Sequence, residues 1–151
     1  MAKFSTGLRD YLAVTGSLKA ALDTGKINIY KGATIPSSPD DALPGDATLM
    51  YTFTVDDDGT TLLDFAASAT NGVLLKDAAQ AWQGEAAAAG DMAFFRYYVP
   101  ADDGETASTT ARRVQGTVGT AFADMIVASV TKALTDPLTL NNFGIAVPEG
   151  P

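Results

Sequence analysis

The sequence predicts a mainly β fold, an antiparallel β-sandwich or jelly roll of about eight strands behind a short helical N-terminal segment. Two observations predict it. After residue 26, apolar side chains recur every second residue in short stretches that end at Gly, Pro, Asp or Asn. No helical pattern of about 10–15 residues alternates with these stretches, which disfavours a parallel α/β sheet. A chain of 151 residues has room for one core, so we expect a helical N-terminal arm at 1–25 and one β-domain at 26–151.

The N-terminal segment has a helical pattern, because its apolar side chains recur at steps of three and four residues. These side chains are Phe4, Leu8, Tyr11, Leu12, Leu18, Ala21 and Leu22. Gly16 interrupts the pattern and Ser17 is a good N-cap, so we expect one weakened helix or two short ones that end near Asp23. The apolar stripe either packs on the domain's own sheet or covers a neighbouring subunit.

The strands are expected in order along the β-domain. The predicted ranges are 27–30, 48–55, 60–65, 73–76, 92–99, 112–118, 124–131 and 139–147. The second alternates most regularly, and the turn at Asp56–Gly59 indicates that 60–65 returns beside it as a hairpin. The alanine-rich stretch 78–90 is ambiguous. Because 92–99 has large side chains on both faces, it is either a central strand or a strand with one face on another subunit.

The composition excludes much chemistry. The chain has no cysteine and no histidine, so it lacks a thiolate nucleophile, the commonest acid–base residue and the commonest metal ligand. The acidic loops Asp56–Asp58 and Asp102–Glu105 lack the ligand spacing of a calcium loop and favour turn chemistry, although cation binding there stays open. We therefore predict no enzyme, no cofactor and no metal site.

The charge and hydropathy of the chain limit its partners. The formal net charge is −8 at pH 7, which disfavours nucleic acid and anionic membrane surfaces. No apolar run approaches the length of about 18 residues that a membrane-spanning helix needs. We therefore predict neither a nucleic-acid partner nor a membrane partner.

Arginine and aromatic side chains supply the candidates for contact with another protein. Arg112 and Arg113 point to opposite faces of one strand. One is expected to be exposed to solvent, and the other, on the side of Val114, needs a carboxylate partner if it is buried, within the domain or across an interface. Arginine and tyrosine are enriched at such interfaces. The predicted contact residues are Phe4, Leu8, Tyr11, Leu12, Phe94, Arg96, Tyr98 and Arg112.

Several segments resemble small virion structural proteins of tailed bacteriophages. They are Ala2–Arg9, Gly16–Leu22, Ile27–Gly32, Gly72–Lys76 with Trp82, Ala93–Arg96, Arg113–Gly119 and Phe143–Pro148. Within that group the chain is most similar to head decoration (cement) proteins with a jelly-roll fold. The resemblance implies a non-enzymatic protein on the outer surface of the capsid. It also implies a homotrimer that bridges neighbouring subunits of the major capsid protein.

Two alternatives to decoration stay open at this point. The first is a tail or neck adaptor, or a baseplate-associated component, which would form rings of more copies than a trimer. The second is a tip module that binds host carbohydrate. In that module Trp82, Tyr97 and Tyr98 would form a stacking platform for sugar rings.

Overall fold

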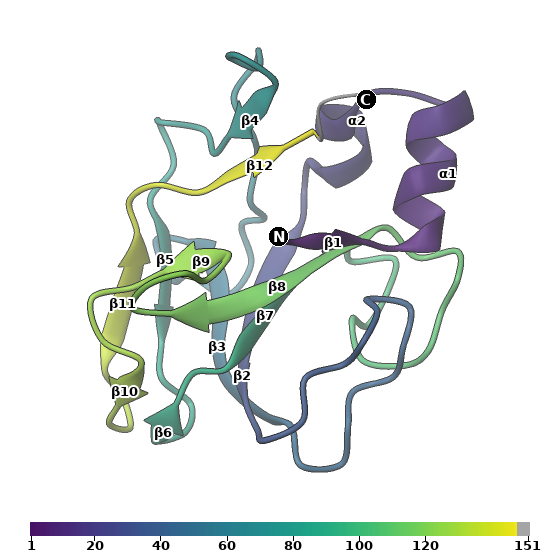
Figure 1. The fold of residues 1–151 in the computed structure, drawn as a ribbon. Helices are drawn as coiled ribbons and strands as arrows, with labels where there is room; N and C mark the ends of the chain where they lie inside the picture. Colours follow the sequence, from purple (N-terminus) through teal and green to yellow (C-terminus); the bar gives the residue numbers. More distant parts are fainter. Residues whose placement is uncertain (148–151) are drawn as a thin grey trace.

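The computed structural model describes residues 1–147 and confirms a mainly β fold with a short helical N-terminal segment (Figure 1). The helices are α1 (Thr6–Val14) and α2 (Leu18–Leu22). Eight strands share one sheet: β1 (Lys3–Phe4), β2 (Lys26–Lys31), β3 (Thr48–Val55), β5 (Trp82–Glu85), β7 (Phe94–Tyr98), β8 (Arg113–Gly119), β9 (Met125–Ile126) and β11 (Pro137–Leu140). Two smaller sheets pair β4 (Val73–Leu75) with β12 (Gly144–Ala146) and β6 (Gly90–Asp91) with β10 (Thr131–Lys132).

The large sheet is almost wholly antiparallel. Its order is β1-β8-β7-β2-β3-β5-β11, and only β9 joins in parallel, beside β8. This arrangement is consistent with a β-sandwich, while the jelly-roll order of strands stays a prediction. Strand β7 lies between β8 and β2, which confirms the central-strand alternative for the stretch 92–99.

The central strands are buried on both faces. Ile27 of β2 lies opposite Tyr97 of β7, and both side chains face the apolar core. The next row across the sheet is Asn28, Arg96 and Gln115, whose side chains point to the opposite face. Each of these five side chains is at most 4% exposed. The sheet therefore has an apolar layer on one side and a buried polar layer on the other.

The N-terminal segment packs on the domain's own sheet. Strand β1 pairs with β8, and the helices place the fully buried Leu8 and Leu22 in the same core as the strands. Helix α2 begins after Ser17, whose hydroxyl accepts a hydrogen bond from the Ala20 N–H, as expected of an N-cap. Of the two expected packings for the apolar stripe, the structure has the one within the chain.

The predicted hairpin partner at 60–65 is wrong. Strand β3 pairs with β2 and β5 instead, and Leu63 makes only an isolated bridge to Gly25. Asp56 and Asp57 both have φ of 54° and form a tight turn, in which the Asp58 N–H donates to the Val55 carbonyl. The chain after this turn does not pair along β3, because β2 lies on one side of that strand and β5 on the other. The stretches 124–131 and 139–147 each contain short strands separated by irregular backbone, β9 and β10 in the first and the end of β11 and β12 in the second.

Ser5 connects helix α1 to strand β8 and is fully buried. Its hydroxyl accepts hydrogen bonds from the Leu8 N–H at 3.2 Å and the Arg113 N–H at 2.9 Å, and it donates one to the Ala111 carbonyl at 2.7 Å. This one hydroxyl therefore caps helix α1 and accepts the hydrogen bond of the first backbone N–H of strand β8.

Replacing Ser5 with alanine should destabilise the fold more than an ordinary cap mutation does. We expect Ser5→Ala to lower the free energy of unfolding by about 2–3 kcal/mol, because two buried N–H groups lose their acceptor. Ser17→Ala, at the exposed cap of α2, is the matched control, with a loss of about 1 kcal/mol. Urea unfolding followed by circular dichroism measures both, and equal losses would contradict the assigned role of Ser5.

Candidate functional site

Two long loops cover the polar side of the sheet. Residues 32–47 connect β2 to β3, and residues 99–112 connect β7 to β8; the two run side by side in Figure 1. The loops are joined directly, because the Leu43 N–H donates to the Glu105 carbonyl at 2.8 Å and the Ser108 N–H donates to the Asp40 carbonyl at 2.9 Å. We call the exposed surface of these two loops the loop face.

Arg96 of β7 is fully buried and forms hydrogen bonds with both loops. Its Nη1 donates to the Asp41 carbonyl at 3.1 Å and to the Gly104 carbonyl at 2.8 Å, one in each loop. Its Nε and Nη2 donate to Gln115 Oε1 at 3.2 and 2.6 Å. None of these acceptors is a carboxylate. Burial, followed by repulsion from Arg113, lowers the pKa of Arg96 to about 10.

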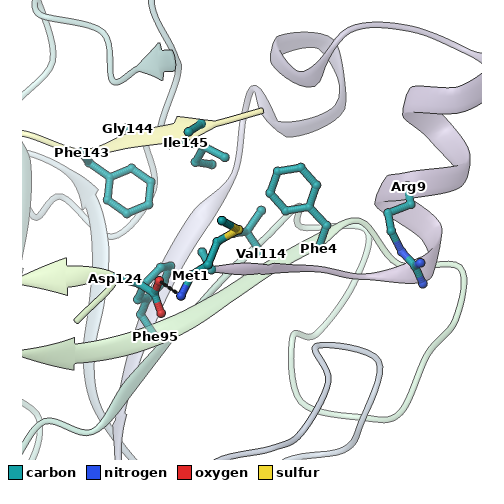
Figure 2. Close-up of a pocket in the computed structure, with 11 residues that line it drawn as sticks. Met1, Phe4, Arg9, Phe95, Val114, Asp124, Phe143, Gly144 and Ile145 are labelled. Carbon is teal, nitrogen blue, oxygen red and sulfur yellow. Dashed lines mark ion pairs between the residues drawn. The ribbon is translucent and has the colours of Figure 1, made fainter. Parts of the chain in front are cut away.

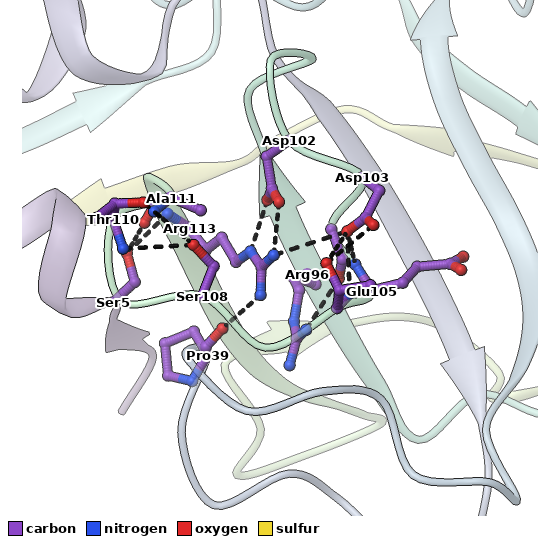
Figure 3. Close-up of polar contacts among 12 residues, drawn as sticks. Ser5, Pro39, Arg96, Asp102, Asp103, Glu105, Ser108, Thr110, Ala111 and Arg113 are labelled. Carbon is purple, nitrogen blue, oxygen red and sulfur yellow. Dashed lines mark hydrogen bonds and ion pairs between the residues drawn. The ribbon is translucent and has the colours of Figure 1, made fainter.

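Arg113 is the second buried guanidinium (Figure 3). It forms a bidentate ion pair with Asp102, with Nε 2.6 Å from Oδ2 and Nη2 2.5 Å from Oδ1. Its Nη1 donates to the Pro39 carbonyl at 3.0 Å. Arg113 therefore holds the loop 99–112 through a charge and the loop 32–47 through a carbonyl.

The buried polar layer is fully occupied by these contacts. In the part of the chain that the structure describes, no buried side-chain nitrogen or oxygen lacks a hydrogen-bond partner. Gln115 completes the layer by donating to the Pro36 carbonyl at 2.8 Å. What this arrangement does chemically is to fix two loops in one conformation.

The carboxylates of the acidic loops hold their own turns. Asp58 accepts hydrogen bonds from the hydroxyl of Thr61 and from the backbone N–H groups of Thr61 and Thr60, and these contacts lower its pKa to about 2. Asp103 accepts in the same way from the N–H groups of Glu105 and Thr106, which lowers its pKa. Within residues 1–147, no group of three or more acidic side chains is placed to hold a metal ion.

The structure separates the predicted contact residues into two sets. Leu8, Phe94 and Arg96 are fully buried inside the chain, so they have no surface to offer a partner, which corrects the prediction for these three. Leu8 is buried because helix α1 packs against the apolar core, whereas Phe94 and Arg96 lie on the second covered face of the sheet, which alternation in a single strand does not reveal. The partly exposed set is Phe4, Tyr11, Leu12, Tyr98 and Arg112.

Arg112, on the side of Val114, was expected to need a carboxylate if buried, and the structure corrects which of the two arginines is buried. Its guanidinium lies over the ring of Tyr11, 4.9 Å from the centroid, and its side chain is only half-buried. The buried, carboxylate-paired arginine is its neighbour Arg113. The partner carboxylate comes from within the domain.

The proposed sugar-stacking platform does not form. Trp82 and Tyr97 are fully buried in the core, where the Trp82 ring packs edge-on against Phe65 at 5.5 Å between centroids. Only Tyr98 of the three retains some exposure. A carbohydrate-binding role through these rings is therefore wrong, because no sugar can reach two of them.

An open apolar cleft lies between β12 and the pair β1–β8 (Figure 2). Its volume is about 390 Å³. Phe143 and Ile145 line it from the side of β12, and Phe4 faces them from β1. At one end the Asp124 carboxylate lies 3.0 Å from the ammonium group of Met1. The cleft has apolar walls and one polar end, and it lies on the core side of the sheet, away from the buried arginines.

One exposed aromatic residue near this cleft is not marked by any sequence pattern. Phe122 lies in the turn between β8 and β9, is fully exposed, and has φ of 54°. Its surroundings, Thr120–Ala123, have no apolar periodicity that could have drawn attention to it. The available signal was a lone phenylalanine in a turn of small residues, where a large apolar side chain is unusual.

Comparisons with known proteins give no relative from which a role could be transferred. No protein-family model, no curated protein and no solved structure matches the chain. Among the described residues, no helix is long and apolar enough to cross a membrane.

Proposed function

We propose that the protein is a non-enzymatic structural component of a tailed-bacteriophage virion. It decorates the outer surface of the capsid as a homotrimer and bridges neighbouring subunits of the major capsid protein. The resemblance of segments such as Arg113–Gly119 to phage virion proteins supports this proposal. The geometry supports it through the loop face.

The observation that carries the proposal is the rigidity of the loop face. Two loops far apart in the sequence are fastened to one sheet by Arg96, Arg113 and Gln115, so the loop face has its shape before any partner arrives. A preformed surface loses little conformational entropy on binding. A protein that occupies many identical sites on a shell then gains avidity from weak single contacts.

The loop face also has the composition of a contact surface. Ile35 is 42% exposed in the loop 32–47, and Asp103 and Glu105 are exposed acidic residues of the loop 99–112. A surface with an exposed apolar side chain and exposed carboxylates suits a protein partner that has basic groups on its facing surface.

The test is to locate the chain on particles of the phage that encodes it. Immunogold labelling of purified virions should place it on the head, and purified chain should co-sediment with expanded capsid shells. Ile35→Asp should weaken this binding at least tenfold, whereas Leu134→Asp, at an exposed leucine outside the loop face, should not. Label on the tail or neck would favour the adaptor alternative, and no label on the particle would overturn the proposal.

A further inference from the structure

Phe122 projects from a turn that is fixed at its base. The Thr117 N–H donates to Asp124 Oδ2 at 2.9 Å, and the Val127 N–H donates to the Gly119 carbonyl at 2.9 Å, on either side of the turn. The left-handed backbone at Phe122 is unfavourable for a residue with a large side chain. The fold therefore holds an aromatic ring in water at a conformational cost, and no contact within the described chain compensates for it.

The apolar cleft next to this turn can bind an aromatic ring. Asp124, two residues after Phe122, is one of its lining residues, so ring and cleft open on neighbouring parts of one surface. The walls are the side chains of Phe4, Phe143 and Ile145, and a volume of about 390 Å³ is ample for one phenyl ring. Phe122 does not line its own cleft.

Charge favours a second copy of the chain as the occupant. Two molecules of net charge −8 repel each other over most of their surfaces. The stretch 114–131, which carries Phe122, contains a single charged side chain, Asp124. Apart from the ammonium group at Met1, the cleft has only Arg9 and Asp124 as charged lining residues. These two surfaces carry little charge, so copies of an acidic protein can approach one another there with little repulsion.

We propose that Phe122 of each copy inserts into the cleft of the next copy. Each molecule then inserts one ring and accepts one, and such a contact repeated with a closing rotation forms a cyclic oligomer. Ile126, 67% exposed on β9 just beyond Asp124, lies at the edge of the contact. This inference rests on the homotrimer of the proposed function and names the residues through which its subunits meet, but it does not depend on binding to a capsid.

The experiment uses the purified chain alone, with light scattering over a range of concentrations. The wild type should have the mass of an oligomer, two or more times 15.6 kDa. Phe122→Ala should raise the dissociation constant by about ten- to a hundredfold for each ring removed. Ala146→Trp, at an exposed residue that lines the cleft, should do the same by filling the receptor. Leu134→Ala, another exposed apolar residue, is the matched control and should not change the mass.

Mixing the two interface variants gives a sharper result. Phe122→Ala keeps an open cleft and Ala146→Trp keeps the ring, so one intact contact can form between them. An equimolar mixture should give a one-to-one complex that neither variant forms alone. Circular dichroism checks that both variants are folded, as expected for changes at exposed positions.

Three outcomes would overturn the inference. They are a wild type that stays monomeric at high concentration, an oligomer that survives Phe122→Ala, and a mixture in which no complex forms. A dimer that depends on both residues would support the exchange of rings and reject the trimer. A monomer that still labels phage heads would reject this inference and leave the proposed function standing.

Discussion

Arg113→Ala is expected to cost about 3–5 kcal/mol of unfolding free energy, one of the two largest effects that we predict. The substitution removes a fully buried guanidinium and leaves the mostly buried carboxylate of Asp102 without its partner. It also removes the donor to the Pro39 carbonyl, so both loops lose an attachment. Urea unfolding measures the loss. Limited proteolysis should show faster cleavage within 32–47 and 99–112.

The adjacent arginine provides the matched control for this prediction. Arg112 is half-buried and contacts the ring of Tyr11, so Arg112→Ala should cost only about 0.5–1 kcal/mol. The double variant Arg113→Met, Asp102→Leu removes both charges, and it should recover part of the stability lost in Arg113→Ala if the unpaired carboxylate causes the loss. Equal losses for the two single arginine variants would contradict the assignment of the buried ion pair to Arg113.

Sequence patterns predict the fold well where apolar and polar side chains recur regularly along an element. The strand at 48–55 was predicted with the bounds it has, and Ser17 was identified as the start of α2. The two-faced stretch 92–99 correctly indicated a central strand, because large side chains on both faces need cover on both sides. The prediction of a hairpin after Val55 was wrong because β5, which is distant in the sequence, occupies the edge of β3 where the stretch 60–65 was expected to pair.

The buried polar layer could not be predicted in the same way. It exists because two irregular loops fold back over the sheet, and no periodicity marks a loop as a cover. For this reason the sequence favours Arg112 over Arg113 as the buried arginine and places Phe94 and Arg96, which are fully buried, among the residues that contact a partner.

The second large effect is expected at alkaline pH, because four tyrosines have raised pKa values. Burial raises the pKa of Tyr30 to about 12, raises that of Tyr97 well above its ordinary value of 10.0, and raises those of Tyr51 and Tyr98. The unfolded chain loses these protons near pH 10, whereas the folded chain keeps them. The stability from the tyrosines is therefore complete below about pH 10 and is lost as the pH rises through the folded-state pKa values.

Ionisation of Arg96 changes the free energy of unfolding in the opposite direction between pH 10 and 12.5. Its pKa is lowered from 12.5 to about 10, mainly by burial, so the folded chain releases that proton first and gains stability as the pH rises from 10 to 12.5. One arginine offsets about one of the four tyrosines. The net expectation is a fall above pH 10, at a rate of up to about 1.4 kcal/mol per pH unit for each uncompensated proton.

Urea midpoints between pH 7 and 11.5 measure this fall, with tyrosinate absorbance recorded on the same samples. Tyr97→Phe is the informative variant, because the phenol donates hydrogen bonds to the carbonyls of Leu22 at 2.6 Å and Leu63 at 3.3 Å. It should cost about 1–2 kcal/mol at pH 8 and then lose stability less steeply than the wild type above pH 10. Tyrosinate that forms near pH 10 while the urea midpoint stays constant would mean that these phenols ionise in the folded state. In that case burial of the tyrosines does not limit the alkaline stability of the protein.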